Sequence, residues 1–246
     1  MSPTAISLLV FLCVFGGALL GIALRGVLPE HHLSGETKDV VKASIALIGT
    51  MSALVLGLLV ASAKGTFDTQ KDELTSLSAH VILLDNVFQH YGPDADKARG
   101  ALRDAVADTL AHVSEGVGNP QTSSRGKAVY DAVLGLAPKD DVQKALKAEA
   151  QSLLLTLGQT RALMLAQKGS ALSSTLLLVV VFWLVVNFVS FGLFAKPNPT
   201  ATSALLIAAL SVAGAIFLIL EMDRPYDGLI HISDTPLREA LAEMGK

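Results

Sequence analysis

The sequence predicts an all-α polytopic membrane protein with four transmembrane helices and a helical cytoplasmic insertion between the second and the third. Of its 246 residues, 51% are hydrophobic and only 17% are charged, with a mean hydropathy of +0.52, whereas soluble domains carry about a quarter charged residues. Four charge-free runs are long enough to cross a bilayer: residues 2–24, 43–63, 169–195 and 197–220. The rest of the chain has helical periodicity and no strand signal.

These runs divide the chain into four parts. Residues 1–65 hold the first two spans, residues 66–168 form the cytoplasmic insertion, residues 169–222 hold the last two spans, and residues 223–246 form a cytoplasmic C-terminal segment. The side that holds the insertion and both termini carries more basic residues near the membrane ends. They are Lys64, Lys71, Arg161, Lys168, Arg224 and Arg238, against Arg25, Lys38, Lys42 and Lys196 on the other side. We therefore expect the first side to be cytoplasmic.

The first span carries Cys13, Gly17 and Gly21 on one face, which predicts close helix packing. Cys13 is the only cysteine, so intrachain disulfides and cysteine metal clusters are excluded. The third span carries Asn187, and an amide inside a membrane requires a partner helix or a wet cavity because its exposure to lipid is costly. We favour a helix contact over a conducting role for this residue.

The second span has two distinct faces. Small residues recur at every fourth position on one of them: Gly49, Ala53, Gly57 and Ala61. This stripe predicts a helix-packing surface, because small residues let helices approach closely in lipid. The other face is apolar in the middle and hydroxylated at both ends: Ser44, Ile48, Met51, Val55, Leu58 and Ser62. Such a face is typical of a pore-lining helix or of an ordinary bundle helix, and the residues alone leave both open.

The second span is expected to continue as a helix into the insertion, with a flaw allowed at Gly65, because no proline lies between Pro29 and Pro93. Beyond Lys64, apolar residues at alternating spacings of three and four form a seam: Leu74, Leu77, Val81, Leu84, Phe88 and Tyr91. This pattern is typical of a coiled coil or of a tight bundle. Further helices are expected at residues 94–115, around residues 127–136, and from about residue 138 onward. The last should continue into the third span, because no proline occurs before Pro197.

The fourth span ends in an acidic block with the sequence EMDRPYDG. Carboxylates at the C-terminal end of a helix oppose its dipole, so they do not serve local helix stability. Together with Asp68, the block supplies the candidate gating or cation-binding residues Glu221, Asp223 and Asp227. We expect structural salt bridges for the block, to Lys64, Lys168 or Arg224, rather than a bound cation.

Catalytic and cofactor motifs are missing from the sequence, so we expect neither an enzyme nor a cofactor. Glu30, His31, His32 and Glu36 lie close together in the first loop, but their spacing matches no metal signature, and a solvated turn is expected instead of a metal site. The net charge of −3 gives no indication of nucleic-acid binding.

Two long blocks carry a family resemblance. They are TKDVVKASIALIGTMSALVLGLLVASAKGTFD and LILEMDRPYDGLIHIS. On these blocks, and on the order of spans and insertion along nearly the whole chain, the sequence resembles the bestrophin-like domain family of bacterial membrane proteins. That family is similar in architecture to bestrophins, which are pentameric chloride channels with four spans per subunit and a pore lined by the second span.

The resemblance implies a homo-oligomer, with the pentamer as the form that bestrophins adopt, in the bacterial inner membrane. The second span would then line the pore, with Ile48, Met51, Val55 and Leu58 as an apolar constriction that gates by dewetting. The chain departs from bestrophins in three respects: it lacks a neck of three phenylalanines, a long C-terminal tail and an obvious acidic calcium clasp. These departures bear on ion selectivity and on calcium control.

The predicted function is therefore a homo-oligomeric bestrophin-like ion channel, with the lipid bilayer, further copies of the chain and inorganic ions as its partners. Acidic rings at Glu36, Asp39 and Asp68 would favour cations if they faced the pore, whereas the bestrophin resemblance slightly favours anions. The alternative is a non-conducting membrane scaffold or signalling protein whose cytoplasmic helical bundle binds a partner through the seam at residues 74–91.

Overall fold

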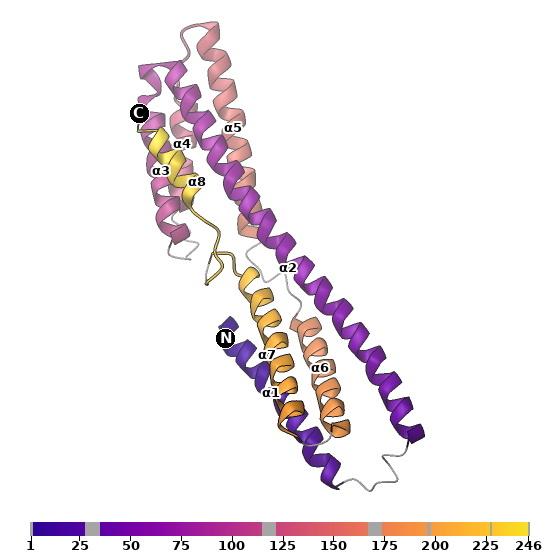
Figure 1. Cartoon of the computed structure of the whole chain (residues 1–246). Helices are drawn as coiled ribbons and strands as arrows, with labels where there is room; N and C mark the ends of the chain where they lie inside the picture. The colour runs from indigo at the N-terminus through magenta and orange to yellow at the C-terminus, as the bar shows by residue number, and fades with distance from the viewer. Residues whose placement is uncertain are drawn as a thin grey trace. The chain divides into compact units, whose positions relative to one another are not determined.

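The computed structural model describes residues 2–27, 35–114, 122–166, 174–195, 198–226 and 228–245, and every regular element in these ranges is a helix (Figure 1). The elements are α1 (Pro3–Val27), α2 (Gly35–Tyr91), the short 3₁₀ helix η2 (Pro93–Ala95), α3 (Asp96–Ser114), α4 (Thr122–Leu134), α5 (Asp141–Ala166), α6 (Ser174–Phe194), α7 (Pro199–Met222) and α8 (Thr235–Glu243). The all-α class is confirmed for the described residues.

Within the described ranges, four helices are long and apolar enough to cross a membrane: α1, the first part of α2, α6 and α7. The most apolar 18-residue stretches of these helices have mean hydropathies of 2.3 to 2.6, so in length and composition they match the four expected spans of a membrane protein. The helix α2 runs for 57 residues without a break, as its lack of proline predicts. The predicted continuity of α5 and α6 falls on residues 167–173, which lie outside the described residues.

The chain forms two compact units. The first unit comprises Met1–Thr66 and Ser170–Arg224, and the second comprises Phe67–Gly169 and Pro225–Lys246. The sequence places the corresponding boundaries after residues 65, 168 and 222. The helix α2 contributes residues to both units.

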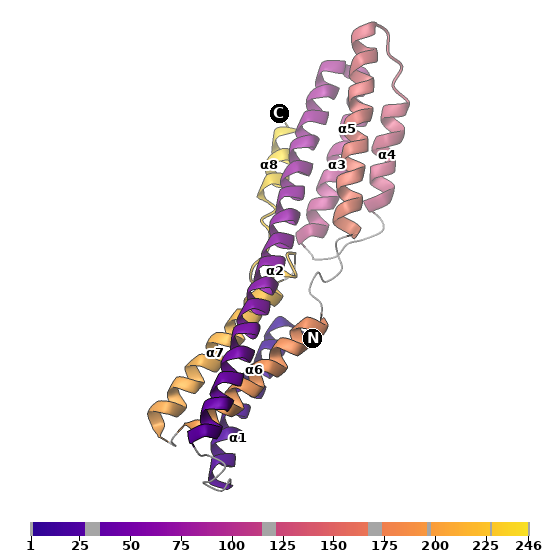
Figure 2. The same cartoon turned by 90° about the vertical axis from the view of Figure 1, so that its right-hand side faces the viewer.

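In the first unit, α1 packs against α6 and α7 (Figures 1 and 2). The contact with α6 brings backbone against backbone at two glycines. A Cβ atom on Gly21 would overlap the carbonyl oxygen of Val189, and a Cβ atom on Gly192 would overlap the carbonyl oxygen of Ala18. No side chain can shift to relieve these overlaps, because the neighbouring atoms are backbone. The close packing predicted for Gly21 therefore occurs here, with α6 as the partner.

The same glycines define the direction of the two helices. Gly17 lies opposite Val185 and Val189, and Gly21 lies opposite Val189 and Leu193, so residue numbers rise together and the helices are parallel. Parallel first and third spans are the arrangement that a four-span topology requires. Cys13, the third member of the predicted small face, is exposed and takes no part in this contact.

Arg25 lies at the end of this helix pair. Its Nη1 donates hydrogen bonds to the carbonyl oxygens of Phe194, at 3.1 Å, and of Ala195, at 2.8 Å. Carbonyls at the C-terminal end of a helix lack partners within the helix, and the dipole favours a positive charge there. The last turn of α6 contains no basic residue, so Arg25 of α1 supplies the missing cap.

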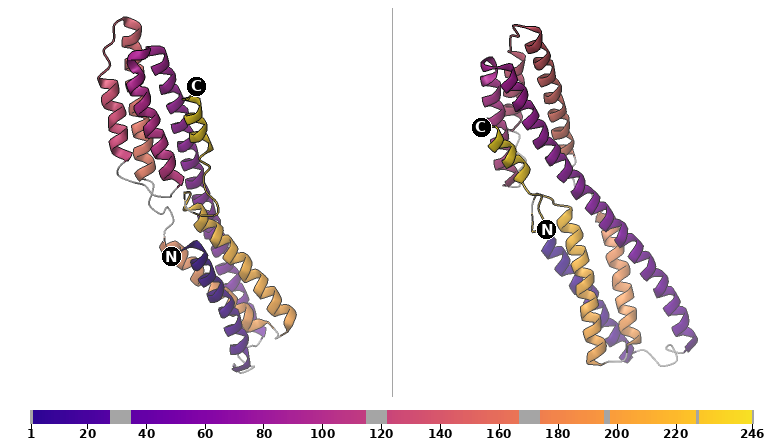
Figure 3. Two further views of the ribbon diagram at one scale, coloured as in Figure 1. Left: turned by 90° about the vertical axis from the view of Figure 1, so that its left-hand side faces the viewer. Right: turned by 45° about the horizontal axis from the view of Figure 1, so that its top comes forward.

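In the second unit, the apolar seam of α2 is buried by helices of the same chain. Leu84 and Phe88 are 0% and 2% exposed, and they share a core with residues of α3, α4, α5 and α8. These helices run beside the second part of α2 (Figures 2 and 3). The seam is therefore that of a tight bundle. The hypothesis that it docks a partner protein is wrong, because the chain's own helices already cover these side chains.

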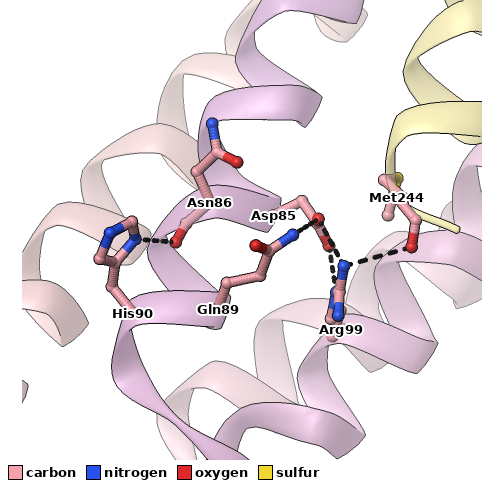
Figure 4. A network of polar contacts seen from close by, with 6 residues as sticks. All are labelled: Asp85, Asn86, Gln89, His90, Arg99 and Met244. Carbon is pink, nitrogen blue, oxygen red and sulfur yellow. Dashed lines mark hydrogen bonds and ion pairs between the residues drawn. The ribbon is translucent and has the colours of Figure 1, made fainter. Parts of the chain in front are cut away.

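An ion pair between a buried carboxylate and a half-buried arginine joins three helices of this bundle (Figure 4). The Asp85 side chain on α2 is 4% exposed, and Arg99 on α3 donates from Nε to its Oδ1 at 2.7 Å and from Nη2 to its Oδ2 at 3.0 Å. Gln89 donates to the same Oδ2 at 2.9 Å. Arg99 Nη2 also donates to the carbonyl oxygen of Met244, at the end of α8, at 3.3 Å. The bidentate geometry makes this a strong, orienting contact.

The helix α8 was not predicted from the sequence. It has nine residues, too few to be stable alone, and it is held by the burial of Leu237 and Ala240 against the bundle. The chain before it turns at Gly228, whose φ of 134° suits glycine. The loop is closed by a hydrogen bond of 2.8 Å from the Ile232 N–H to the Pro225 carbonyl oxygen.

We predict that Gly192→Ala destabilises the first unit by about 1–3 kcal/mol or more, because the added methyl group meets the backbone of α1. Thermal unfolding of the detergent-solubilised protein, followed by the fluorescence of Trp183, measures the effect. The control is Gly16→Ala, whose Cβ would meet nothing within 4 Å. Equal midpoints for the two variants would contradict the close approach of α1 and α6.

We also predict that Asp85→Asn destabilises the second unit by about 1.5–3 kcal/mol, the range for a hydrogen bond to a charged group. The amide cannot accept both N–H groups of Arg99, which then lies beside a neutral group. Chemical denaturation followed by circular dichroism measures the loss. The matched control is Asp94→Asn, which removes the exposed ion pair with Lys139 and should leave the denaturation midpoint nearly unchanged.

Candidate functional site

The membrane half of α2 is covered by its own chain on one face only. Ile45, Ser52, Leu59 and Ala63 are 8% exposed or less. Leu59 and Ala63 pack with residues of α6 and α7. Within the described part of the chain, 17% of the most apolar window of α2 is buried, which is the lowest share among the four spans. Most of the surface of this span is therefore available for lipid or for another copy of the chain.

The small-residue stripe lies mainly outside this covered face. Ala53, Gly57 and Ala61 are exposed. A Cβ atom on Gly57 would meet no atom within 4 Å, whereas one on Gly49 would lie 3.6 Å from Oδ1 of Asn187 on α6. Among the described residues, only the Gly49 end of the stripe therefore shows a close contact with another helix.

The face predicted to line a pore lies beside the covered face. Ser44, Met51, Leu58 and Ser62 are exposed, while Ile48 and Val55 are half-buried. Val55 packs against the cluster formed by Leu59, Ala63, Val180 and Ile219. The Ser44 hydroxyl donates to the carbonyl oxygen of Val40 at 3.0 Å, so it bonds within its own helix.

Two leucines that the sequence analysis did not single out are among the most exposed residues of the span. Leu47 and Leu54 are 64% and 70% exposed. At 3.6 residues per turn they lie opposite Ile45 and Ser52. Their seven-residue spacing can be read from the sequence and places them on one face of the helix. That this face points away from α6 and α7 is apparent only from the contacts of α2 with those helices.

The acidic block lies where α7 ends. Glu221 is 3% exposed, and Asp223 forms the C-cap of α7. Each takes part in a hydrogen-bonding or electrostatic interaction, as does Asp68 in the second unit. Asp227 lies outside the described residues. Gating and cation binding by these four residues stay predictions.

In the first loop, residues 30–36 include four residues of types that can bind a metal ion. Glu30, His31, His32 and the side chain of Glu36 lie outside the described residues. Within the described ranges, no group of three or more His, Cys, Asp or Glu side chains is placed to hold a metal ion.

Tyr226 follows the acidic block and belongs to the second unit. Its hydroxyl group is buried and has no hydrogen-bond partner among the described residues. Burial raises the pKa of Tyr226 to about 12, and the nearby Glu73 carboxylate acts in the same direction. The phenol is therefore held in its neutral form.

We predict that this tyrosine makes the fold sensitive to alkali. Between about pH 10, the ordinary tyrosine pKa, and the raised pKa of about 12, the unfolded chain has released the proton that the folded protein retains, so stability falls as the pH rises. Tyr226→Phe should reduce this loss, and Tyr130→Phe on an exposed part of α4 should not. Denaturation midpoints across this pH range measure the effect. Burial also raises the pKa of Tyr91, so part of the loss should remain in Tyr226→Phe.

Comparison with known proteins places the chain in a family. A family model described as "Bestrophin-like domain" matches residues 12–237, which include most of the first span, the other three spans and the helical region between the second and third. Searches of curated proteins and of solved structures found no match. Because the family model covers most of the chain and contains both sequence blocks, the chain belongs to the bestrophin-like domain family.

Proposed function

We propose that the chain assembles into a homo-oligomeric ion channel whose pore runs along α2, with anions as the favoured ions. The observation that carries this proposal is the uncovered surface of α2 in the membrane. A helix that meets only lipid has no need of small residues, whereas Ala53, Gly57 and Ala61 form a stripe that suits contact with another helix. The family membership supports both the oligomer and the ion.

The faces of α2 suit a ring of subunits. In such a ring, the side of α2 opposite its own α6 and α7 faces the axis, and the small-residue stripe faces a neighbour. Met51 and Leu58 are the apolar members of the predicted lining set that are least covered by their own chain, at 44% and 64% exposure. With Leu47 and Leu54 they would form an apolar constriction, which gates by wetting and dewetting.

Lysines at the two ends of the span favour anions. Lys42 immediately precedes the charge-free run of α2, Lys64 immediately follows it, and both side chains are exposed within their own chain. In a ring they would place positive charge near both ends of the span, on the flanks of α2 rather than on its axial face, and such charge attracts anions. Asp39 and Asp68 lie farther from the membrane on the same helix and would moderate this preference.

We further propose that the second unit and both termini are cytoplasmic, in a bacterial inner membrane, and that the protein is not an enzyme. The scaffold alternative has lost its main support, because the seam that would have docked a partner lies in the core of the second unit.

The number of subunits tests the proposal first. Native mass spectrometry of the detergent-solubilised protein should show a closed ring of about four or more copies, because a central pore needs several α2 helices around one axis. A monomer or dimer would leave no shared axis for α2 and would overturn the channel proposal.

We predict that Leu58→Ser raises anion flux several-fold in proteoliposomes, because a hydroxyl group wets an apolar constriction. Leu210→Ser is the control: Leu210 is 63% exposed on α7, away from the proposed axis, and its substitution should leave flux unchanged. An assembled Leu58→Ser ring with unchanged flux would show that this face of α2 does not line the pore. Val55→Ser should have a smaller effect, because Val55 packs against its own chain.

A further inference from the structure

A crevice lies between α2 and α6 inside the first unit. Its volume is about 570 Å³, and it is lined by Lys42, Ile45, Ala46 and Gly49 of α2 and by Asn187, Phe191, Phe194 and Ala195 at the end of α6. Phe191 forms part of the wall and packs edge-on against the buried ring of Phe188, with 6.1 Å between ring centroids. The walls are mainly apolar, with Lys42 and Asn187 as the polar side chains.

Asn187 lines this crevice, and its side-chain oxygen is a hydrogen-bond acceptor that has no donor among the described residues. The residue is 4% exposed, and its Nδ2 donates to the carbonyl oxygen of Trp183 at 3.0 Å. That bond fixes the orientation of the amide, because only the nitrogen can donate to a carbonyl. Oδ1 is buried and receives no hydrogen bond from the described residues. It lies 3.6 Å from the position of a Cβ atom on Gly49, where the small residue leaves room.

The opposite end of the crevice is positively charged. Lys42 lies seven residues before Gly49 on α2, a rise of about 10 Å at 1.5 Å per residue. Arg25 donates to the carbonyl oxygens of Phe194 and Ala195, which belong to the residues that line this end. Asp39, the nearest acidic residue before Lys42 on α2, does not line the crevice.

We propose that this crevice is filled with water in the membrane, that water donates to Asn187 Oδ1 at its inner end, and that its positive mouth admits small hydrated anions in preference to cations. Lipid chains carry no donor and would leave the amide oxygen unmatched, whereas the crevice is large enough for several waters that bond to one another and to Asn187. Water access does not depend on ion conduction, so a dry crevice would contradict this proposal without contradicting the proposed channel.

Cysteine accessibility tests the proposal, because Cys13 is the only cysteine and Cys13→Ser removes it. In that background, Gly49→Cys places a thiol at the inner end of the crevice, where a Cβ atom makes ordinary contact. Ala46→Cys places one nearer the mouth. Ile207→Cys is the control, since Ile207 is 65% exposed on α7 and does not line the crevice. Each variant is reconstituted in lipid nanodiscs and treated with anionic or cationic thiosulfonate reagents.

The Gly49→Cys and Ala46→Cys variants should react about tenfold or more faster than Ile207→Cys, because the reactive thiolate forms in water rather than in hydrocarbon. The anionic reagent should react faster than the cationic one, and Lys42→Gln should reduce that difference. A Gly49→Cys thiol as unreactive as the control would overturn the proposal, since lipid or a neighbouring helix would then fill the crevice.

Replacing the acceptor separates the role of Asn187 from the shape of the crevice. Asn187→Leu should slow the reaction of the Gly49→Cys thiol toward the control rate, because an apolar inner end does not hold water. In the Asn187→Leu background, the Ala46→Cys thiol near the mouth should still react, so a loss confined to Gly49→Cys shows that only the inner end of the crevice has lost its water. An unchanged Gly49→Cys rate would contradict the proposed role of Asn187.

Discussion

The membrane unit depends on the close approach of two backbones. Where Gly21 of α1 meets Val189 and Gly192 of α6 meets Ala18, no Cβ atom fits between the helices. Inside a bilayer, apolar side chains gain little from leaving lipid for protein, so helix association relies on van der Waals contact at short range. This contact positions the end of α6 within reach of Arg25, and the capped end of α6 in turn forms one wall of the crevice beside Asn187.

The two units are stabilised by different physical means. The second unit resembles a soluble helical bundle, with a core of large apolar side chains such as Leu84, Phe88 and Leu237 and an ion pair from Arg99 to the buried Asp85 that orients three helices. Removal of apolar surface from water drives this packing. The first unit is stabilised instead by close backbone contact at glycines, by the arginine that caps α6 and by the shape of the helix surfaces.

Features that arise from helical periodicity or from long runs of one composition could be predicted from the sequence. They include the four spans, the unbroken α2, the packing role of Gly21 and the apolar seam that ends at Tyr91. Features that depend on contacts between distant residues could not. Arg25 is separated from its acceptors on α6 by 169 and 170 residues, and Asp85 and Arg99 are ordinary surface residue types until the fold brings them together. The sequence predicts the seam but leaves a coiled coil and a tight bundle both open, because a periodic pattern predicts a contact surface and not what covers it.

The pairing of α1 with α6 also constrains how the protein is made. The first span leaves the ribosome long before its partner does, and at about 5–20 residues per second the delay across 169 residues is on the order of ten to thirty seconds. During that time the glycine face of α1 is in the membrane without the helix that fits it. The nascent chain therefore carries an unmatched packing surface on α1 until the third span is inserted.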